Sequence, residues 1–528
     1  MGKWGKMLAV LVIGGAILAG CSSSKDNGNS PQNSAGASGN SATSSSGASP
    51  AQNQPLKTLT FLDYNNPSWP YSADWPIWKY LQEKTGVKLD IQVPPGTLED
   101  ATSLAVASGS MPDMIWTQEK ARADKYGQQG ALANILDYVD EMPNFKKWMA
   151  QFPEAVQAAL AADGKMYVFP NEGMGETNRM LWMYRQDIFE KNGLKQPETW
   201  DELYATLKKL KELYPKSYPL TFRSGLRYLQ NFGASFNTVG SVSSTQVSVY
   251  FDQDKKEFVY GATEDNFKKM VTYLNKFYKE GLIPPDFLTV DTKIWQDIMS
   301  TDRAFVTLDY IGRIDFYNSA LRKNNPNFTL SFMKPPAGWE GGPQKNAYTQ
   351  ITEEGVMVSS QSKNIHDIMK YMDFFYTDEG KSLTSWGKEG ETFKVEDGKN
   401  KFIGDFTDVS DLRKKTGIST DGVFVWFDYD SHISLASPEL KVAYEEAAKY
   451  DSQPQPKPAF NQQEQEIIST KGDALIKNRD ENISKFILGS RSLGEWDKYV
   501  QEQKKLGVDE LLDVYKKAYE RTLQATGK

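Results

Sequence analysis

Cysteine and histidine are the residues that this chain has least of. Cys21 is the single cysteine among 528 residues, and His366 and His432 are the two histidines. A single cysteine excludes an intrachain disulfide framework and a cysteine-based metal site. Histidine-based catalytic triads are disfavoured, since His366 follows Asn364 at the start of a predicted helix and His432 has no evident partner in the sequence. The chain also has no Gly-x-Ser-x-Gly elbow, His-Glu-x-x-His pair or phosphate-binding glycine loop.

Basic charge and sequence repeats are scarce too. Lysine and arginine number 61 against 68 aspartates and glutamates, with no long basic run, which disfavours a nucleic-acid partner. No repeat of fixed period is present, although a surface adhesin or matrix component would be expected to carry one. The 39% share of hydrophobic residues is ample for packed cores, and the length predicts two large lobes or about three average domains.

A long hydrophobic run is also missing. The apolar stretch Met7 to Ala19, behind Lys3 and Lys6, is too short to cross a hydrocarbon layer of about 30 Å. Its charged start and small final residues predict that residues 1–20 are a secretory signal peptide. The Leu-Ala-Gly-Cys sequence ending at Cys21 resembles the bacterial lipobox. That implies a lipid such as palmitate on this cysteine and anchoring at the outer face of the cell membrane; an ordinary signal peptide with a stray cysteine is the alternative.

Residues 21–55 consist almost wholly of Ser, Gly, Asn, Ala, Gln and Pro. Such a segment cannot bury enough apolar surface to offset the entropy lost on ordering, so we expect it to be disordered. A flexible coil of this length spans roughly 30 Å, which suits a tether between a membrane surface and a folded body.

After residue 56 the pattern alternates between strands and helices. The stretches 57–62, 87–93 and 114–116 are predicted as strands with helices between them. This order predicts a parallel sheet with right-handed crossovers. Further strands are predicted at 165–170, 181–184, 304–308, 329–333 and 355–358, with helices behind Thr199, over 267–278 and 366–375, and from about Ser437. The predicted fold class is therefore α/β.

Several motifs of this body, taken in order, resemble those of one family. They are the Gly-Ser-Met-Pro-Asp-Met-Ile run at 109–115, the Gly-Lys-Met-Tyr-Val-Phe-Pro run at 164–170, the segment 185–202 and the Thr-Asp-Glu-Gly turn at 377–380. The ordered set resembles the extracellular solute-binding proteins of carbohydrate ABC transporters. The Trp-Gly-x-Glu-Gly stretch at 386–390 resembles the large lipoprotein branch, which includes binders of oligosaccharides and uronate polymers.

The resemblance implies a two-lobed periplasmic-binding-protein-like fold, in which each lobe is a mostly parallel sheet flanked by helices and the ligand cleft lies between the lobes. On this basis we assign residues 56–174 and 349–376 to lobe 1 and residues 175–348 and 377–528 to lobe 2, with crossings near 173–178, 346–349 and 376–377. It also implies a monomer that captures an oligosaccharide without cleaving it and delivers it to the permease subunits of an ABC transporter.

A sugar presents an apolar face and a rim of hydroxyls, so its site needs aromatic rings beside hydrogen-bonding side chains. Open α/β sheets place such groups on the loops that follow strands. Residues of these kinds on such loops predict the ligand-binding set Tyr64, Asn65, Trp69, Trp116, Gln118, Glu176, Arg223, Asp309, Tyr310, Arg313, Trp386, Glu391 and Trp426. Packing in a core is the alternative for each aromatic residue. If Arg223, Arg227 and Arg313 face the cleft, a uronate or other acidic sugar is favoured, because guanidinium binds carboxylate through two hydrogen bonds.

Two further alternatives stay open at this point. A secreted polysaccharide-degrading glycoside hydrolase would also combine carboxylates with aromatic rings, and 68 acidic residues supply carboxylate pairs by chance. No cofactor is expected, but the alternating acids from Asp252 to Glu257 faintly resemble a calcium loop. They lack the glycine and the third acid of an EF-hand, so a charged hairpin turn is the favoured interpretation and calcium is kept as the alternative.

Overall fold

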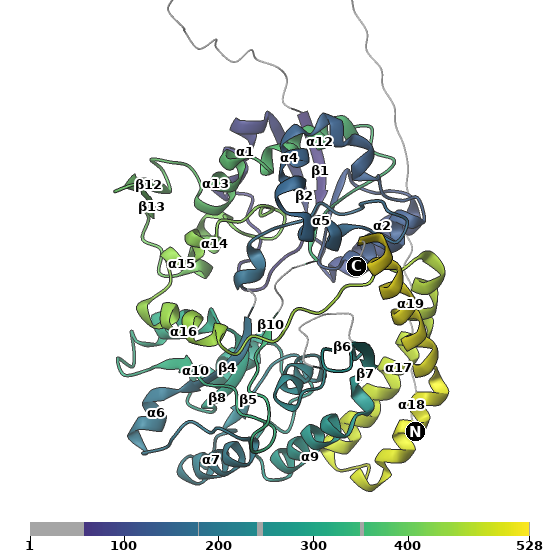
Figure 1. Ribbon diagram of the computed structural model, residues 1–528. Helices are drawn as coiled ribbons and strands as arrows, with labels where there is room; N and C mark the ends of the chain where they lie inside the picture. Colours follow the sequence, from purple (N-terminus) through teal and green to yellow (C-terminus); the bar gives the residue numbers. More distant parts are fainter. Residues whose placement is uncertain (1–56, 178, 240–246, 349–352, 527–528) are drawn as a thin grey trace, which may run out of the picture. The chain divides into compact units, whose positions relative to one another are not determined.

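The computed structural model describes residues 57–177, 179–239, 247–348 and 353–526. The predicted signal peptide, Cys21 and the predicted tether lie outside the described residues. All described residues belong to one compact unit, which begins at Gln54. Helices and strands alternate along it, as predicted for an α/β chain (Figure 1).

The elements have the following bounds. The strands are β1 (Lys57–Leu62), β2 (Val87–Gln92), β3 (Met114–Thr117), β4 (Arg179–Arg185), β5 (Leu220–Thr221), β6 (Val249–Asp252), β7 (Glu257–Tyr260), β8 (Val306–Tyr310), β9 (Leu330–Phe332), β10 (Ala347–Tyr348), β11 (Gly355–Val358), β12 (Phe393–Glu396) and β13 (Lys399–Phe402). The α-helices are α1 (Pro76–Thr85), α2 (Leu98–Ser108), α3 (Lys120–Gln128), α4 (Pro143–Gln151), α5 (Pro153–Ala159), α6 (Gln186–Lys191), α7 (Trp200–Leu213), α8 (Leu226–Leu229), α9 (Asp265–Lys279), α10 (Thr292–Ser300), α11 (Arg313–Leu321), α12 (Ile365–Phe375), α13 (Asp378–Trp386), α14 (Val409–Thr416), α15 (Tyr429–Ser434), α16 (Pro438–Ala448), α17 (Gln462–Leu488), α18 (Trp496–Leu506) and α19 (Val508–Thr526).

The first sheet has the strand order β11-β3-β1-β2. β1 pairs in parallel with β2 and β3, whereas β11 runs antiparallel to β3. α1 and α2 connect the three parallel strands, so the predicted strand–helix–strand run is confirmed. Pro76 begins α1, and Gly86 follows it with a φ of 69°, a left-handed conformation that glycine adopts without steric cost.

The second sheet has the order β10-β4-β8-β5, with β9 also paired to β4. β4 runs antiparallel to β8, β9 and β10, and β5 runs parallel to β8. The sheet is therefore mostly antiparallel, whereas a mostly parallel one was expected. The predicted strand at 165–170 is absent from the described sheets. There the backbone bonds to separate partners: Phe169 donates to the carbonyl of Val356 at 2.9 Å, and Met166 accepts from Ile135 at 2.8 Å and forms an isolated bridge with Leu160. These bonds do not make the repeated ladder that defines a strand.

Two groups of buried side chains define two lobes. The core of the first lobe draws on residues between Leu59 and Met174 and between Val356 and Phe427. The core of the second lobe draws on residues between Met180 and Ala347 and between Ala436 and Leu511. The chain thus passes between the cores near 174–180, 347–356 and 427–436.

The first two of these crossings overlap the predicted ones, and the third does not. The sequence analysis placed the third at 376–377 and assigned everything after it to lobe 2. Leu383, Leu412 and Ile418 instead pack into the first core, because α13 and α14 cover the first sheet before the chain returns. The remaining lobe boundaries stay predictions.

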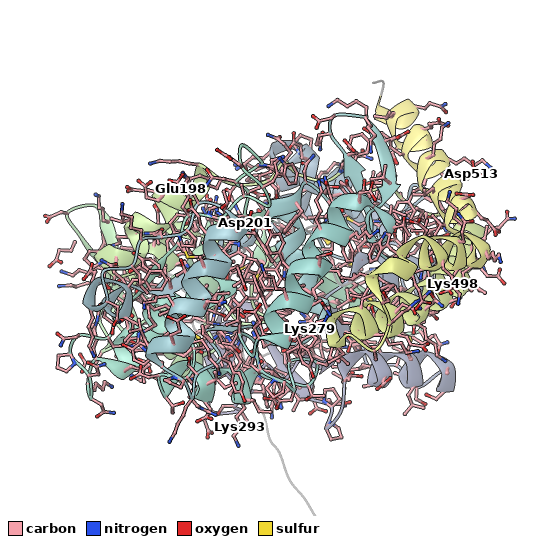
Figure 2. All side chains as sticks on the ribbon, turned by 90° about the horizontal axis from the view of Figure 1, so that it is seen from below. Glu198, Asp201, Lys279, Lys293, Lys498 and Asp513 are labelled. Carbon is pink, nitrogen blue, oxygen red and sulfur yellow. The ribbon has the colours of Figure 1, made fainter. Side chains whose placement is uncertain are left out.

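Charged side chains lie on the outside of the body. Glu198 and Asp201 at the start of α7, Lys279 on α9, Lys498 on α18 and Asp513 on α19 are all exposed (Figure 2). Among the described helices, none combines the length and the apolar character needed to cross a membrane.

Candidate functional site

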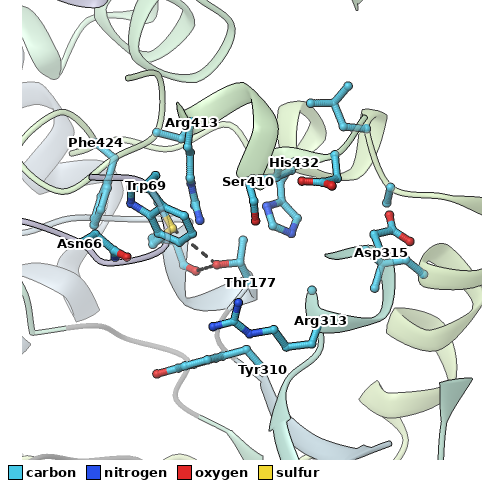
Figure 3. A pocket seen from close by; sticks show the side chains of 18 of the residues that line it. Asn66, Trp69, Thr177, Tyr310, Arg313, Asp315, Ser410, Arg413, Phe424 and His432 are labelled. Carbon is cyan, nitrogen blue, oxygen red and sulfur yellow. Dashed lines mark hydrogen bonds between the residues drawn. The ribbon is translucent and has the colours of Figure 1, made fainter. Parts of the chain in front are cut away.

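A cavity of about 280 Å³, called here the first cavity, lies where segments of the two lobes meet. Its lining comes from the loop after β1, the first and third crossings, the end of β8, and helices α11, α14, α15 and α16. The lining residues are Asn66, Trp69, Gln118, Met174, Thr177, Tyr310, Gly312, Arg313, Asp315, Glu354, Asp408, Val409, Ser410, Arg413, Ser419, Asp421, Phe424, His432, Leu435, Ala436, Leu440 and Tyr444. In Figure 3, Trp69 and Arg413 lie on one side of it, and Tyr310 and Arg313 lie on the other.

Trp69 reaches the cavity from the loop that follows β1. In this loop the side chain of Asn66 accepts the N–H of Ser68 at 3.0 Å. Because asparagine side chains that bond nearby backbone groups fix turns, the loop sequence itself helps to orient Trp69. The guanidinium carbon of Arg413 lies 4.5 Å from the centroid of the indole ring, which is a cation–π arrangement.

Tyr310 and Arg313 reach the cavity from the second lobe, and the buried Asp309 holds both. The Asp309 carboxylate accepts the Tyr310 N–H at 2.9 Å and the Arg313 Nε at 3.1 Å. It also accepts two hydrogen bonds from Arg223, whose remaining Nη1 donates to Thr292. Burial alone would raise the pKa of Asp309, but the charges of Arg223 and Arg313 outweigh it and the pKa is lowered. The carboxylate is therefore ionised and fixes the Arg313 guanidinium at the cavity wall.

Arg413 supplies the second guanidinium. Its Nε has no hydrogen-bond partner in the part of the chain that the structure describes, and burial lowers the pKa of Arg413. The neighbouring Asp421 has its pKa raised by burial, and the charge of Arg413 opposes that shift. The amide of Asn66 donates to Asp421 at 3.4 Å. A guanidinium with an unused donor at a cavity wall is suited to bind a carboxylate or hydroxyl of a ligand.

His432 contributes a neutral imidazole from α15. The side chain is buried, and its Nε2 shares a hydrogen bond with the Tyr444 hydroxyl at 2.8 Å. Its Nδ1 has no partner among the described residues. Burial, and then the charge of Arg413, lower the pKa of His432 to about 3. The ring is therefore uncharged at neutral pH and retains one unused nitrogen.

Two acidic residues of the lining, Asp315 and Asp408, are engaged by protein donors. Asp315 accepts the N–H of Ser437 at 2.8 Å and its hydroxyl at 2.6 Å. Asp408 caps α14 by accepting the N–H of Asp411 at 3.0 Å, and the Ser319 hydroxyl donates to it at 3.1 Å. The carboxylates of Asp315 and Asp408 therefore already have hydrogen-bond donors within the protein.

The structure brings part of the predicted ligand-binding set together. Trp69, Gln118, Tyr310 and Arg313 line the cavity. Arg223 and Asp309 do not line the cavity. They lie behind Tyr310, and Asp309 positions Tyr310 and Arg313, which do line it. Glu176 belongs to the short helical turn Met174–Thr177 of the first crossing, and its side chain is outside what the structure describes.

Trp116 and Trp386 lie in cores, contrary to the prediction. Trp116 is 0% exposed and packs edge-on against Phe424, because every residue of β3 is buried. Trp386 is 2% exposed, packs beside Phe402, and donates its Nε1 to Asp428 at 2.8 Å. Neither ring presents a face to a ligand.

The other predicted residues outside the lining are Tyr64, Asn65, Glu391 and Trp426. Glu391 pairs with Lys388 at 2.6 Å and accepts the Tyr80 hydroxyl at 3.0 Å, away from the cavity. Tyr64 packs against the first core, and the exposed Asn65 accepts the N–H of Tyr71. Trp426 is half-buried, with the Lys381 Nζ 5.1 Å from its ring centroid. These side chains serve local structure.

Sequence reasoning missed Arg413, Asp421 and His432. Arg413 begins an Arg-Lys-Lys run at the end of α14, a pattern typical of an exposed helix terminus. His432 lines the cavity because it lies on the third crossing, and no local sequence motif predicts that crossing. One signal was available, since a histidine next to Tyr429 and Phe427 is typical of a buried position.

The acids from Asp252 to Glu257 form the turn between β6 and β7. Asp252 accepts the N–H groups of Asp254 and Lys255, both at 3.0 Å, and pairs with the Lys255 Nζ at 3.0 Å. The interpretation as a charged hairpin turn is confirmed. Within the described residues, no group of three or more His, Cys, Asp or Glu is arranged to hold a metal ion.

Comparison with known sequences gives one family and several curated relatives. The model of the bacterial extracellular solute-binding protein family matches residues 67–382. The fructooligosaccharide ABC transporter substrate-binding protein FusA of Streptococcus pneumoniae is 24% identical over 89% of this chain and 91% of its own. The polygalacturonan/rhamnogalacturonan-binding protein YtcQ of Bacillus subtilis is 22% identical over 98% of this chain and 99% of its own.

Comparison with solved structures shows the fold. The alginate-binding protein AlgQ2, solved without calcium ion, has a TM-score of 0.76 at 23% identity. The match covers 88% of this chain and 98% of AlgQ2. An EF-hand mutant of FusA in complex with fructo-nystose has a TM-score of 0.73 at 20% identity, over 100% of its length and 89% of this chain. The predicted two-lobed α/β fold is thereby confirmed.

Proposed function

Because the chain belongs to the bacterial extracellular solute-binding protein family, we propose that it binds an oligosaccharide in the first cavity and delivers it to the permease of an ABC importer. The observation that carries the proposal is the placement of Trp69 and Tyr310. Trp69 follows β1 of the first sheet and Tyr310 ends β8 of the second, and both rings line the same cavity. Rings on both lobes allow a sugar to be held by stacking only when the lobes are close together, which couples binding to closure.

We propose further that the sugar is acidic. Arg313 and Arg413 line the cavity, and among the described residues the Arg313 hydrogen bond is made by its Nε alone. Their unused N–H donors suit a carboxylate, which a guanidinium binds more strongly than a neutral hydroxyl. Relatives named for polygalacturonan and alginate support an acidic ligand, whereas the one named for fructooligosaccharides supports a neutral one.

The proposal includes a lipid anchor at Cys21 and action as a monomer at the outer face of the membrane. The Leu-Ala-Gly-Cys sequence that ends at Cys21 supports the anchor. The chain is proposed to act without chemical catalysis. Among its cavity carboxylates, Asp315, Asp408 and Asp421 accept hydrogen bonds from protein donors, whereas a glycoside hydrolase needs a carboxyl pair free to act on the glycosidic bond.

A thermal-shift and calorimetric screen tests the proposal. The full chain is titrated with galacturonate oligomers, alginate oligomers and kestose, and each sugar is analysed for new reducing ends. We expect an acidic oligomer to raise the melting temperature, kestose not to, and every sugar to be recovered intact. Binding of kestose alone would contradict the acidic assignment, and released reducing ends would support a glycoside hydrolase.

Matched arginine variants connect this result to the cavity. Arg413→Gln and Arg313→Gln each remove one cavity guanidinium and are expected to weaken acidic oligomers about tenfold, as for one lost charge-assisted hydrogen bond. Arg303→Gln is the control, because Arg303 is half-buried and pairs with Asp297 outside the cavity lining.

A further inference from the structure

A second cavity, of about 400 Å³, adjoins the first. Its lining consists of Asp315, Asn318, Ser319, Arg322, Lys323, Thr407, Leu435, Ser437 and Glu439. Asp315 and Leu435 line both cavities, so the two spaces meet along a shared wall. The second cavity receives residues from α11 and α16 of the second lobe and, through Thr407, from the segment that precedes α14.

The first cavity is small for an oligosaccharide. Its 280 Å³ falls just below the range of about 300 to 1,000 Å³ that encloses drug-sized ligands. A sugar chain whose first units fill the first cavity must therefore leave it, and the neighbouring space past Asp315 offers a continuation.

The second cavity has the chemistry of a hydroxyl-binding surface rather than a stacking surface. Its lining contains no aromatic ring and has Leu435 as its only fully apolar side chain. Arg322 donates to both oxygens of Glu439 and to the carbonyl of Phe328, so it is a fixed part of the wall. The exposed Lys323 and Thr407 keep polar groups turned toward solvent.

A hydrogen bond joins the two lobes beside the shared wall. The Ser319 hydroxyl, in the second cavity, donates to the Asp408 carboxylate, in the first, at 3.1 Å. It links α11 to the N-terminus of α14. A ligand that spans both cavities would therefore contact the lobes on either side of this bond.

We propose that the second cavity is an additional saccharide subsite, which binds by hydrogen bonds the units of an oligosaccharide that extend beyond the first cavity. The inference rests on the proposed function, because it assumes that the first cavity binds the leading units. It assigns the length preference of the protein to Lys323, Thr407 and their neighbours, separately from the aromatic rings that hold the leading units.

A series of ligand lengths tests the subsite. Galacturonate oligomers from dimer to hexamer, and fructo-oligosaccharides from kestose upward as neutral counterparts, are titrated calorimetrically into the full chain. The test variants are Thr407→Trp, which fills the second cavity, and Lys323→Ala, which removes a cation from its rim. The matched control is Lys293→Ala, at an exposed position of α10 that lines neither cavity (Figure 2).

We expect the wild-type affinity to rise with chain length beyond the dimer, and Thr407→Trp to abolish that rise while changing dimer affinity less than about twofold. Lys323→Ala should weaken the longer galacturonate oligomers about tenfold, as for one charge-assisted contact, whereas the neutral fructo-oligosaccharides are not expected to bind either chain. The inference is overturned if both variants keep the wild-type length dependence, or if dimer and hexamer lose affinity equally. Failure of the wild-type chain to bind any oligomer would instead overturn the proposed function.

Discussion

At the scale of single residues, two aromatic rings of the first cavity, those of Trp69 and Tyr310, each have a guanidinium close to them. Arg413 lies 4.5 Å from the centroid of Trp69, and Arg223 lies 6.0 Å from that of Tyr310. These cations help to fix the ring orientations, because a cation is attracted to the face of an aromatic ring. The rings are thus held ready before a ligand arrives, which lowers the entropy lost on binding.

Removing either ring should therefore weaken binding without unfolding the chain. Trp69→Ala and Tyr310→Ala are each expected to raise the Kd for the bound oligosaccharide roughly ten- to a hundredfold, equivalent to about 1.4 to 2.8 kcal/mol. The measurement is isothermal titration calorimetry. Trp426→Ala is the control, since Trp426 is also half-buried but lies outside the cavity lining. An equal loss in all three variants would refute the assignment of the cavity as the site.

His432 should give the stability of the chain a pH dependence that can be separated from the carboxylates. Its pKa in the folded chain is lowered to about 3, against about 6.5 in an unfolded chain. Between these values the unfolded chain binds a proton that the folded chain does not. The free energy of unfolding therefore falls as the pH is lowered through this window, by up to about 1.4 kcal/mol per pH unit.

Urea denaturation between about pH 6.5 and 4 measures this effect. His432→Gln removes the titrating group while an amide can keep the hydrogen bond to Tyr444, so the variant should lose less stability on acidification than the wild type. His366→Gln serves as the control, because His366 is an exposed histidine that pairs with Glu141. Its free energy of unfolding should change with pH as that of the wild type does. Identical slopes in wild type and His432→Gln would show that burial of this imidazole has no energetic consequence.

How far the site could be predicted from sequence is clearest from its tryptophans. Trp69 lies on the loop after β1 and Trp116 lies within β3, and both were predicted to bind ligand, yet one lines the cavity and the other is fully buried. Residue type and local spacing identify a ring able to stack, but not which face of β3 is covered by later parts of the chain. Tyr310 and Arg313 were predictable because they lie at the end of β8 and directly after it, where the chain lines the cavity and is not covered by a core.

At the scale of elements, local signals predicted helices better than strand pairings. Thr199 was expected to cap a helix, and its side chain accepts the Glu202 N–H at 3.2 Å at the start of α7. The reciprocal hydrogen bond of a capping box is shifted by one residue, since Glu202 accepts the N–H of Glu198 instead of that of Thr199. A cap depends on residues three positions apart, whereas the direction of β4 relative to β8 depends on the route of the intervening chain, which local patterns do not contain.

Backbone contacts around Gly173 join the two segments that lead into the first and third crossings. Phe427 donates its N–H to the carbonyl of Glu172 at 2.8 Å, and Glu172 donates its own to Val425 at 3.0 Å. Gly173 has a φ of 90°, and a Cβ there would lie 2.5 Å from the carbonyl oxygen of Phe427. The two crossings can approach this closely because residue 173 has no side chain.

Gly173→Ala should therefore destabilise the chain by more than backbone strain alone, by about 2 to 3 kcal/mol. Gly164→Ala is the matched control, because Gly164 also has a positive φ of 74° but has open space around its Cβ position, so about 1 kcal/mol is expected. Urea denaturation compares the two. Equal losses would mean that the contact with Phe427 relaxes freely and that the crossings are not rigidly joined there.

At the scale of the whole molecule, the segment between the second and third crossings belongs to the first lobe. α13 and α14 carry Leu383 and Leu412 into the first core and, at the same time, place Asp408 and Arg413 at the cavity. The cavity wall opposite α11 is therefore built from a late part of the sequence. Sequence motifs identified both lobes, but the side on which this segment packs is decided by long-range burial of apolar residues.

Ligand binding should draw the two lobes together, since the groups that would hold the sugar are divided between them. Closure restricts the lobes, so contacts made on both sides must outweigh that cost. Saturation with the bound oligosaccharide is therefore expected to lower the radius of gyration measured by small-angle X-ray scattering. It should also stabilise the folded chain by about 2.7 kcal/mol at a ligand concentration of one hundred times the Kd.

Arg413→Gln, at the same protein and ligand concentrations, should show a smaller change in both quantities because a smaller fraction of it has ligand bound. If calorimetry shows full occupancy of the wild type while the radius of gyration stays constant, the lobes do not move, and the rings hold the sugar in a preformed cavity instead.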